Sequence, residues 1–295
     1  MAAMMKLNDL KKYLNLIGSS LSVIGIIFVA TNIAEYSNQI DASIFTLWLL
    51  LSLVGLVVFY SSINILLAIA WRDLLQYFGV SRNIPWSIKI YGMTQLSKYI
   101  PGNVFQLASR QAIGVAEGIS NIPLAKSALW EILLLLFSGS LYIILILKLI
   151  NVMLPSYAIM LIFLLAASLC YVTALFLFGR YISRALLYYI VLLGITGIIF
   201  VAVLMLVSSE NNDIYTMIIP ICGAYVVAWL VGLLTPGAPA GVGVRELVIF
   251  TLLGSSVNNA DLLTAITLSR IVTVLSDMLF YALAVYWRRS FRTIL

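Results

Sequence analysis

Two short stretches of the chain repeat a proline–glycine pair followed at the same distance by an arginine. Arg110 comes nine residues after Pro101, and Arg245 comes nine residues after Pro236. Apolar segments flank both stretches, so a break in either helix would lie at membrane depth, where backbone amides must be satisfied by protein or by a water-filled cavity. Two interrupted segments at corresponding places in two halves are typical of a transporter binding site. We therefore expect a ligand site where the two breaks meet.

The chemistry that these arginines favour is anion binding. A charge at the centre of a membrane helix costs about 2.5–3.5 kcal/mol on insertion scales, so Arg110 and Arg245 each need a partner or a function. The helical arm after each break would begin near mid-membrane with its free N–H groups and positive dipole end directed inward. A guanidinium also binds phosphate in a bidentate manner. The alternatives are that both arginines snorkel to the headgroups, or that Arg245 pairs internally with Glu246.

Other polar residues near the breaks could complete such a site. Lys98 would add a third cation or snorkel, while Asn103 and Gln106 would bind a polar headgroup or satisfy the backbone of the broken helix. The residues expected to form the two tips are Pro101, Gly102, Pro236, Gly237, Gly241 and Gly243.

Three carboxylates and a fourth intramembrane cation need partners as well. Glu131 and Arg270 lie at roughly corresponding places, in the helix after each break, so we expect them to form a salt bridge across a pseudo-twofold axis, with direct contact to the substrate as the alternative. Asp277 lies seven residues after Arg270, on one helical face that should point into the bundle. Glu131, Glu246 or Asp277 could instead carry a proton for coupling, and no spacing singles one of them out.

The composition is that of a polytopic membrane protein. The chain has 295 residues, of which 63% are hydrophobic and 9% are charged, and its mean hydropathy is +1.11. It contains no histidine, and its two cysteines, Cys170 and Cys222, lie in apolar runs where small buried hydrophobes are expected. We therefore expect no metal, no cofactor, no soluble catalytic domain and no enzymatic activity. The net charge of +6 follows from membrane topology and does not indicate nucleic-acid binding.

The apolar segments predict an all-α polytopic membrane protein with six transmembrane helices and two re-entrant helical hairpins. The predicted crossings are 14–33, 44–70, 127–147, 157–178, 186–207 and 261–287. The hairpins are 87–100 with 104–119 and 215–234 with 242–253, and residues 71–86 should lie along the cytoplasmic headgroups. The helices form one membrane domain, an inverted repeat of 1–150 and 151–295. Of the Lys and Arg outside the predicted membrane segments, only Lys148 falls outside the cell, which predicts a cell-membrane protein with both termini in the cytoplasm.

The segments LSKYIPGNVFQLASR and TPGAPAGVGVRE resemble the two signature segments of the lysylphosphatidylglycerol synthase transmembrane-region family. The resemblance implies a lipid flippase with two oppositely inserted re-entrant hairpins, and single-domain members accompany glycosyltransferases that charge polyprenyl-phosphate carriers with sugar. The residues that it supports are Pro101, Gly102, Arg110, Pro236, Gly237, Gly241, Gly243, Arg245, Glu246 and Arg270. The chain departs from the family in having Glu131-Ile132 where Glu-Arg is common, and in its longer second loop. It lacks the soluble transferase domain, so we expect that it does not itself make an aminoacyl lipid.

These observations predict a flippase that moves an anionic lipid between leaflets, with its phosphate held by Arg110, Arg245 and Arg270. A polyprenyl-phosphate-linked sugar is favoured over an aminoacylated phosphatidylglycerol because no synthase is attached. One alternative is a non-transporting membrane partner of a glycosyltransferase, in which the intramembrane charges pair internally. Another is an intramembrane transferase, for which a carboxylate base is present but no nucleophile–base pair is evident.

Overall fold

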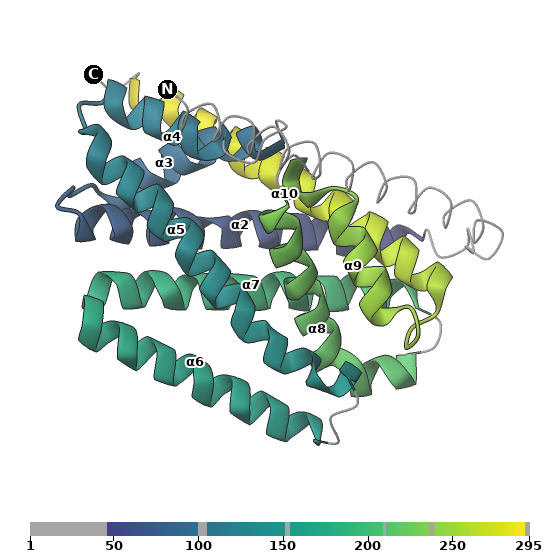
Figure 1. Ribbon diagram of the computed structural model, residues 1–295. Helices are drawn as coiled ribbons and strands as arrows, with labels where there is room; N and C mark the ends of the chain where they lie inside the picture. The colour runs from purple at the N-terminus through teal and green to yellow at the C-terminus, as the bar shows by residue number, and fades with distance from the viewer. Residues whose placement is uncertain (1–45, 100–104, 151–153, 209–210, 236–238, 293–295) are drawn as a thin grey trace, which may run out of the picture.

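The computed structural model describes residues 46–99, 105–150, 154–208, 211–235 and 239–292, and all regular structure in these ranges is helical (Figure 1). The elements in chain order are α2 (Leu47–Tyr77), α3 (Ile84–Thr94), η3 (Gln95–Tyr99), α4 (Phe105–Ala116), α5 (Asn121–Leu141), η4 (Tyr142–Ile150), α6 (Ser156–Phe178), α7 (Arg180–Val207), α8 (Asn211–Leu234), η5 (Pro239–Gly241), α9 (Val244–Leu253) and α10 (Asn259–Arg292). The protein is an all-α polytopic membrane protein, as its composition predicts.

Six segments in the described part of the chain are long and apolar enough to cross a membrane. They are Leu47–Tyr77, Asn121–Ile150, Ser156–Phe178, Arg180–Val207, Ile214–Leu234 and Asn259–Tyr286. Five of them correspond to predicted crossings, and the predicted first crossing, 14–33, lies outside the described residues. The sixth, in α8, was predicted as the first arm of the second hairpin. It has the length of a full crossing, whereas the arm that follows it, α9, has ten residues and is too short to cross.

Helix α2 continues through residues that were predicted to lie along the cytoplasmic headgroups. It ends at Tyr77, and Trp71 and Leu74 in its last turns are buried in the protein. The prediction for 71–86 is therefore wrong for the first part of that segment. The reason is an internal ion pair: Asp73 is fully buried and accepts hydrogen bonds from Arg184 of α7 at 2.7–2.9 Å. Pairing offsets part of the cost of burying the charge, which allows the end of α2 to pack against α7.

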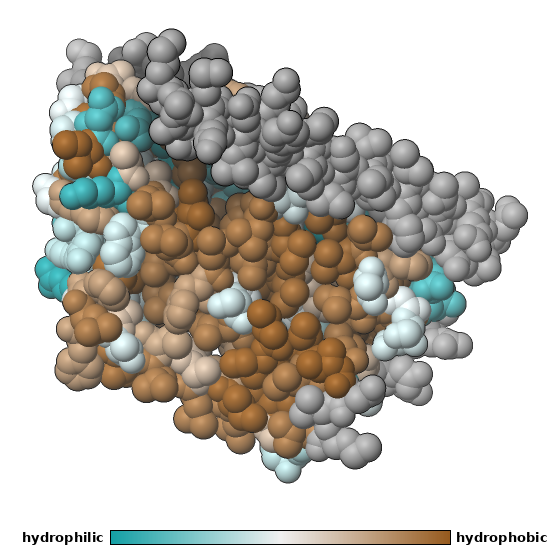
Figure 2. All heavy atoms as spheres, viewed as in Figure 1, coloured by the Kyte–Doolittle hydropathy of each residue, from teal (hydrophilic) through white to brown (hydrophobic). Residues whose placement is uncertain are grey.

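The most buried span is α7, and the most exposed is α6, which packs along one side of the bundle (Figure 1). Figure 2 shows the resulting surface: hydrophobic residues cover the middle of this face, and hydrophilic residues gather toward its two ends. Such a belt is what hydrocarbon requires. Cys222 is buried between α8 and α7, Cys170 is half-buried, and both are free thiols.

The first predicted hairpin is present as α3, η3 and α4, which we call hairpin 1. Its arms have 11 and 12 residues, too few to cross the membrane. They run antiparallel, because Trp86 bonds to Glu117 near the open end and Ser97 bonds to Ser109 at 3.2 Å nearer the tip. The tip itself, with Pro101, Gly102 and Asn103, lies outside the described residues.

Helix α10 shows where hairpin 1 and hairpin 2 (α8, η5 and α9) lie, because both pack along it. A Cβ added to Gly92 of α3 would lie 2.6 Å from the Cβ of Ala284. Nearer the middle of α10, η3 binds Asp277, and further on Arg270 donates to the carbonyl oxygen of Ala240 in η5. These three positions on α10 are seven residues apart, roughly 10 Å per step along a helix. The hairpins thus approach from opposite ends of α10, and η3 contacts η5 near its middle.

Candidate functional site

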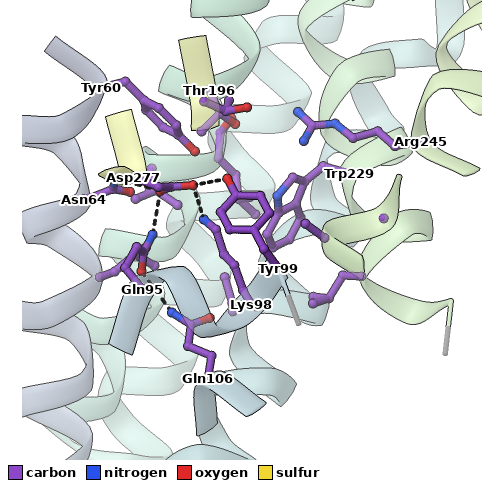
Figure 3. Close-up of a pocket in the computed structure, with 18 of the residues that line it drawn as sticks. Tyr60, Asn64, Gln95, Lys98, Tyr99, Gln106, Thr196, Trp229, Arg245 and Asp277 are labelled. Atoms are coloured by element: carbon purple, nitrogen blue, oxygen red, sulfur yellow. Dashed lines mark hydrogen bonds and ion pairs between the residues drawn. The ribbon is translucent and has the colours of Figure 1, made fainter. Parts of the chain in front are cut away.

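A cavity of about 140 Å³ lies where the two hairpins meet (Figure 3). Hairpin 1, η5, α9 and the spans α2, α5, α7, α8 and α10 all contribute side chains to it. A volume of this size is roughly ten times that of one water-sized probe, so a small polar group fits inside. Residues that flank both predicted breaks therefore border one partly open cavity. The tips Pro101, Gly102, Pro236 and Gly237 lie outside the described residues.

Arg245 of α9 extends into this cavity from the side opposite the Asp277 cluster (Figure 3). Its side chain is only 5% exposed, and its guanidinium carbon lies 4.2 Å from the centre of the Tyr225 ring. Among the described residues no carboxylate lies within salt-bridge distance of it. Contact with an aromatic face is worth about 2 kcal/mol when desolvated, which offsets only part of the cost of burying a cation. Arg245 is therefore a buried cation that has no anionic partner in the part of the chain that the structure describes.

Asp277 of α10 holds the opposite wall of the cavity together. Its carboxylate is fully buried and accepts hydrogen bonds from Asn64 at 3.2 Å, Gln95 at 2.8 Å and Tyr99 at 2.5 Å. Lys98 adds an ion pair at 2.7 Å. All four donors are directed at one carboxylate, so η3 is fixed to α10 and α2 (Figure 3).

Gln106, one of the two neutral donors predicted from the sequence, also bonds within the protein. Gln106 donates to the side-chain oxygen of Gln95 at 2.9 Å, which connects the two arms of hairpin 1 beside the cavity. Asn103 lies outside the described residues.

Arg110 does not line the cavity, contrary to the prediction that it binds the substrate directly. Its guanidinium forms a bidentate pair with Glu131 of α5, with distances of 2.7 and 2.9 Å, and both side chains are 3% exposed. The Tyr91 hydroxyl donates to the same carboxylate at 2.9 Å, and the ring of Tyr91 lies 4.3 Å from the guanidinium carbon. The pair satisfies the charge of Arg110 inside the protein, which fixes the second arm of hairpin 1 to α5.

The expected pairing of Glu131 with Arg270 is also wrong, because each residue pairs within its own half. Arg270 binds Glu246 at 2.5 Å, so hairpin 2 is fixed to α10 as hairpin 1 is fixed to α5. Glu246 also accepts from the N–H of Gly243 at 2.7 Å. This bond satisfies a free N–H at the start of α9, so that N-terminus is already compensated by a carboxylate and was wrongly expected to face an anion.

Sequence reasoning named the charged residues of the cavity but missed most of its neutral and aromatic lining. Tyr60, Asn64, Thr196 and Trp229 all border it. Only Asn64 carried a signal, because an amide within an otherwise apolar span is unusual. The aromatic residues could not be separated in the sequence from ordinary core residues.

Among the described residues, the cavity thus presents one unpaired buried cation, Arg245, and the paired charges of Lys98, Asp277, Arg270 and Glu131. Hydroxyl, amide and aromatic groups form the rest of its wall. This set is suited to a phosphate with a polar substituent, since arginine and hydroxyl groups donate to phosphate oxygens and aromatic faces cover the rest. Within the described ranges no group of three or more Cys, Asp or Glu could hold a metal ion. No protein-family model matches the chain, and no curated protein matches it either.

Proposed function

We propose that this protein is a lipid carrier that moves an anionic lipid between the two leaflets of a membrane. The observation that carries the proposal is Arg245, a buried cation without a carboxylate partner in the described structure, in a cavity between two hairpins that reach it from opposite ends of α10. A lipid phosphate beside Arg245 would supply the missing charge, and pairing would lower the cost of taking a headgroup through low dielectric.

The substrate that we propose is a polyprenyl-phosphate-linked sugar, moved without chemical change. Tyr60, Tyr99 and Trp229 border the cavity together with the amides Asn64 and Gln106, and such side chains bind sugar hydroxyls and sugar faces. An aminoacylated phosphatidylglycerol is less suitable, because its added ammonium group would enter a cavity that already has an excess cation.

Reconstituted liposomes test the proposal. Vesicles with purified protein and a fluorescent polyprenyl-phosphate-glucose should flip the probe faster than empty vesicles, measured by quenching of the outer leaflet. Arg245→Gln should flip it roughly 100-fold more slowly, because an unmatched charge at mid-membrane costs about 2.5–3.5 kcal/mol. Arg245→Lys should keep part of the rate.

Arg180→Ala is the matched control for these variants. Arg180 is exposed at the start of α7, and its guanidinium bonds to the hydroxyl of Tyr181 and lies over the ring of the same residue. This variant should flip lipid at the wild-type rate. Wild-type protein that flips no faster than empty vesicles would contradict the proposal, and a folded Arg245→Gln protein with normal flipping would remove Arg245 from the site.

The observed ion pairs favour one alternative in part. Lys98, Arg110 and Arg270 all pair with carboxylates, as expected for a non-transporting membrane partner of a glycosyltransferase. Arg245 does not follow that pattern, because a purely structural bundle gains nothing from an unpaired buried guanidinium. The same vesicle assay separates the two functions, since a partner subunit would not flip lipid.

A further inference from the structure

The charges around the cavity set a limit on the charge of the ligand, and we propose that the site selects a headgroup with one negative charge, a phosphodiester, over one with two. This inference rests on the proposed carrier function and adds the substrate class. Asp277, by neutralising Lys98, keeps the net charge of the cavity at +1.

The count follows from the ion pairs. Lys98 is neutralised by Asp277, Arg110 by Glu131 and Arg270 by Glu246, with N–O distances of 2.7, 2.7 and 2.5 Å. Arg245 remains without a carboxylate in the described structure. Four cations and three carboxylates leave a net charge of +1.

The two hairpin tips do not alter this count. Residues 100–104 read IPGNV and residues 236–238 read PGA, so neither tip contains an acidic or basic side chain. The remaining lining, which includes Tyr60, Thr196 and Trp229, is neutral. One negative charge therefore balances the cavity as the described residues form it.

The balance matters because the cavity, although partly open, is lined by protein near the middle of a span. A second negative charge would have no counter-charge there, and on insertion scales one unmatched charge at this depth reduces occupancy by roughly 100-fold. In bulk water the second negative charge of the ligand would be screened almost completely. Charge number, more than headgroup shape, is thus the property that this site distinguishes most strongly.

Lys98 is the most exposed of the three paired cations, and we take it as the one that a second negative charge could recruit. Its side chain is 28% exposed, whereas Arg110 is 3% exposed and does not line the cavity. Arg270 also lines the cavity but is 19% exposed and bonds to both Glu246 and the carbonyl oxygen of Ala240. Asp277 prevents that recruitment, because its buried carboxylate already forms an ion pair with the ammonium group of Lys98. Asp277→Asn should therefore free Lys98 and raise the net charge of the cavity to +2.

Two fluorescent probes with the same tail and sugar test this inference in vesicles: polyprenyl-phosphate-glucose with one charge and polyprenyl-diphosphate-glucose with two. Wild-type protein should flip the single-charge probe at least about tenfold faster. Asp277→Asn should reduce or reverse this ratio. Lys98→Gln combined with Asp277→Asn returns the net charge to +1 and should restore the wild-type ratio.

The double variant distinguishes an effect of net charge from an effect of lost structure. Like Asp277→Asn it lacks the ion pair that fixes η3, but its cavity has the wild-type net charge. If Asp277→Asn changes the ratio and the double variant does not restore it, the loss of structure explains the effect and the inference is wrong. Equal wild-type rates for the two probes would also overturn it, while leaving the carrier function intact. Flipping of neither probe by wild-type protein would instead contradict the carrier function. Should Asp277→Asn fail to fold, Thr196→Lys adds a positive charge to the lining and should shift the ratio in the same direction.

Discussion

At the scale of residues, Arg110 and Arg245 follow their hairpin tips at the same distance, but their surroundings differ. Arg110 has Glu131 on the neighbouring helix, at 2.7 Å, and is removed from the cavity by that pair. Arg245 has a carboxylate next to it in sequence, but Glu246 binds Arg270 and the N–H of Gly243. Residues adjacent on a helix point in different directions, so Glu246 leaves Arg245 free to face the cavity. The same sequence signal thus gives a structural arginine in one half and a candidate binding arginine in the other.

Removing Arg110 should therefore affect stability far more than removing Arg245. Arg110→Ala leaves Glu131 buried without its partner, and breaking a buried pair costs about 3–5 kcal/mol. Arg245→Gln loses mainly the contact with Tyr225, worth about 0.5–2 kcal/mol. Thermal unfolding of both proteins in detergent should show a clearly lower midpoint for Arg110→Ala.

An apolar replacement of the whole group provides the control. Arg110→Met with Glu131→Leu and Tyr91→Phe leaves no unpaired charge or hydroxyl, and such replacements are often neutral or stabilising. This triple variant should be more stable than Arg110→Ala and should still flip lipid. A triple variant that folds but does not flip would show that the Arg110 group takes part in transport.

The sequence identified the charged residues of the site, because a charge in an apolar run is conspicuous. It did not identify their partners. Arg110 and Glu131 are separated by a turn of the chain between α4 and α5, and Asp277 is paired with Lys98 from the other half. Such pairings depend on how helices pack, on which the spacing of residues along one helix gives no information.

At the scale of elements, hairpin 2 depends on a close approach of two glycines. Gly241 in η5 has φ +71°, and a Cβ there would lie 2.9 Å from the Cα and 3.2 Å from the carbonyl carbon of Gly232 in α8. All these contacts are to backbone, which cannot move aside as a flexible side chain does. The same contact brings Ala240 within reach of Arg270, so it positions the wall of the cavity.

Gly241→Ala should consequently destabilise the protein and slow lipid flipping. The left-handed backbone costs roughly 1–2 kcal/mol for a residue with a side chain, and the clash adds about 1–3 kcal/mol. Gly79→Ala is the matched control, because Gly79 has φ +81° but nothing within 4 Å of an added Cβ. Gly241→Ala should lower the unfolding midpoint further than Gly79→Ala does. Equal shifts would mean that the approach to Gly232 is not tight.

The sequence predicted which segments are helical more reliably than it predicted where each helix begins and ends. Five predicted crossings and both arms of hairpin 1 are present, since long apolar runs and Pro-Gly breaks are strong local signals. Helices α2 and α7 extend beyond the predicted crossings. Asp73 near the end of α2 pairs with Arg184 near the start of α7, so a carboxylate that would mark a membrane boundary is buried instead. The depth reached by α8 depends on its neighbours, and its composition fits both an arm and a full crossing.

At the scale of the whole molecule, the charges near the two ends of the bundle differ, with cations alone at the helix starts of one end and a cation with an anion at the other. The end formed by the start of α5 and the start of α7 carries Lys126 and Arg180 on its surface. The other end, at the end of η4 and the start of α10, carries Lys148 and Asp261. An excess of Lys and Arg marks the cytoplasmic side, so we propose that the first end faces the cytoplasm. Hairpin 1 then enters from the cytoplasm and hairpin 2 from outside.

Single cysteines at these four positions test that orientation in intact cells. A membrane-impermeant maleimide should label Lys148→Cys and Asp261→Cys directly. It should label Lys126→Cys and Arg180→Cys only after the membrane is permeabilised. The physical reason is that the reagent carries charge and cannot cross hydrocarbon, so each thiol reports the side on which it lies.

The background for this experiment is the protein with Cys170→Ala and Cys222→Ala, because both native thiols are free. Cys222 is buried against the backbone of Gly194, so its smaller replacement should fit without a clash. Labelling of all four positions in intact cells would mean that the cells leak, and a protein that is not expressed at the surface would show no labelling. The reversed pattern would place Arg180 outside, and the two hairpins would then enter from the faces opposite to those proposed. Hairpin 1 bears Lys98 and hairpin 2 bears Arg245. The labelling result therefore also decides which of these two cations a headgroup entering from the cytoplasm meets first.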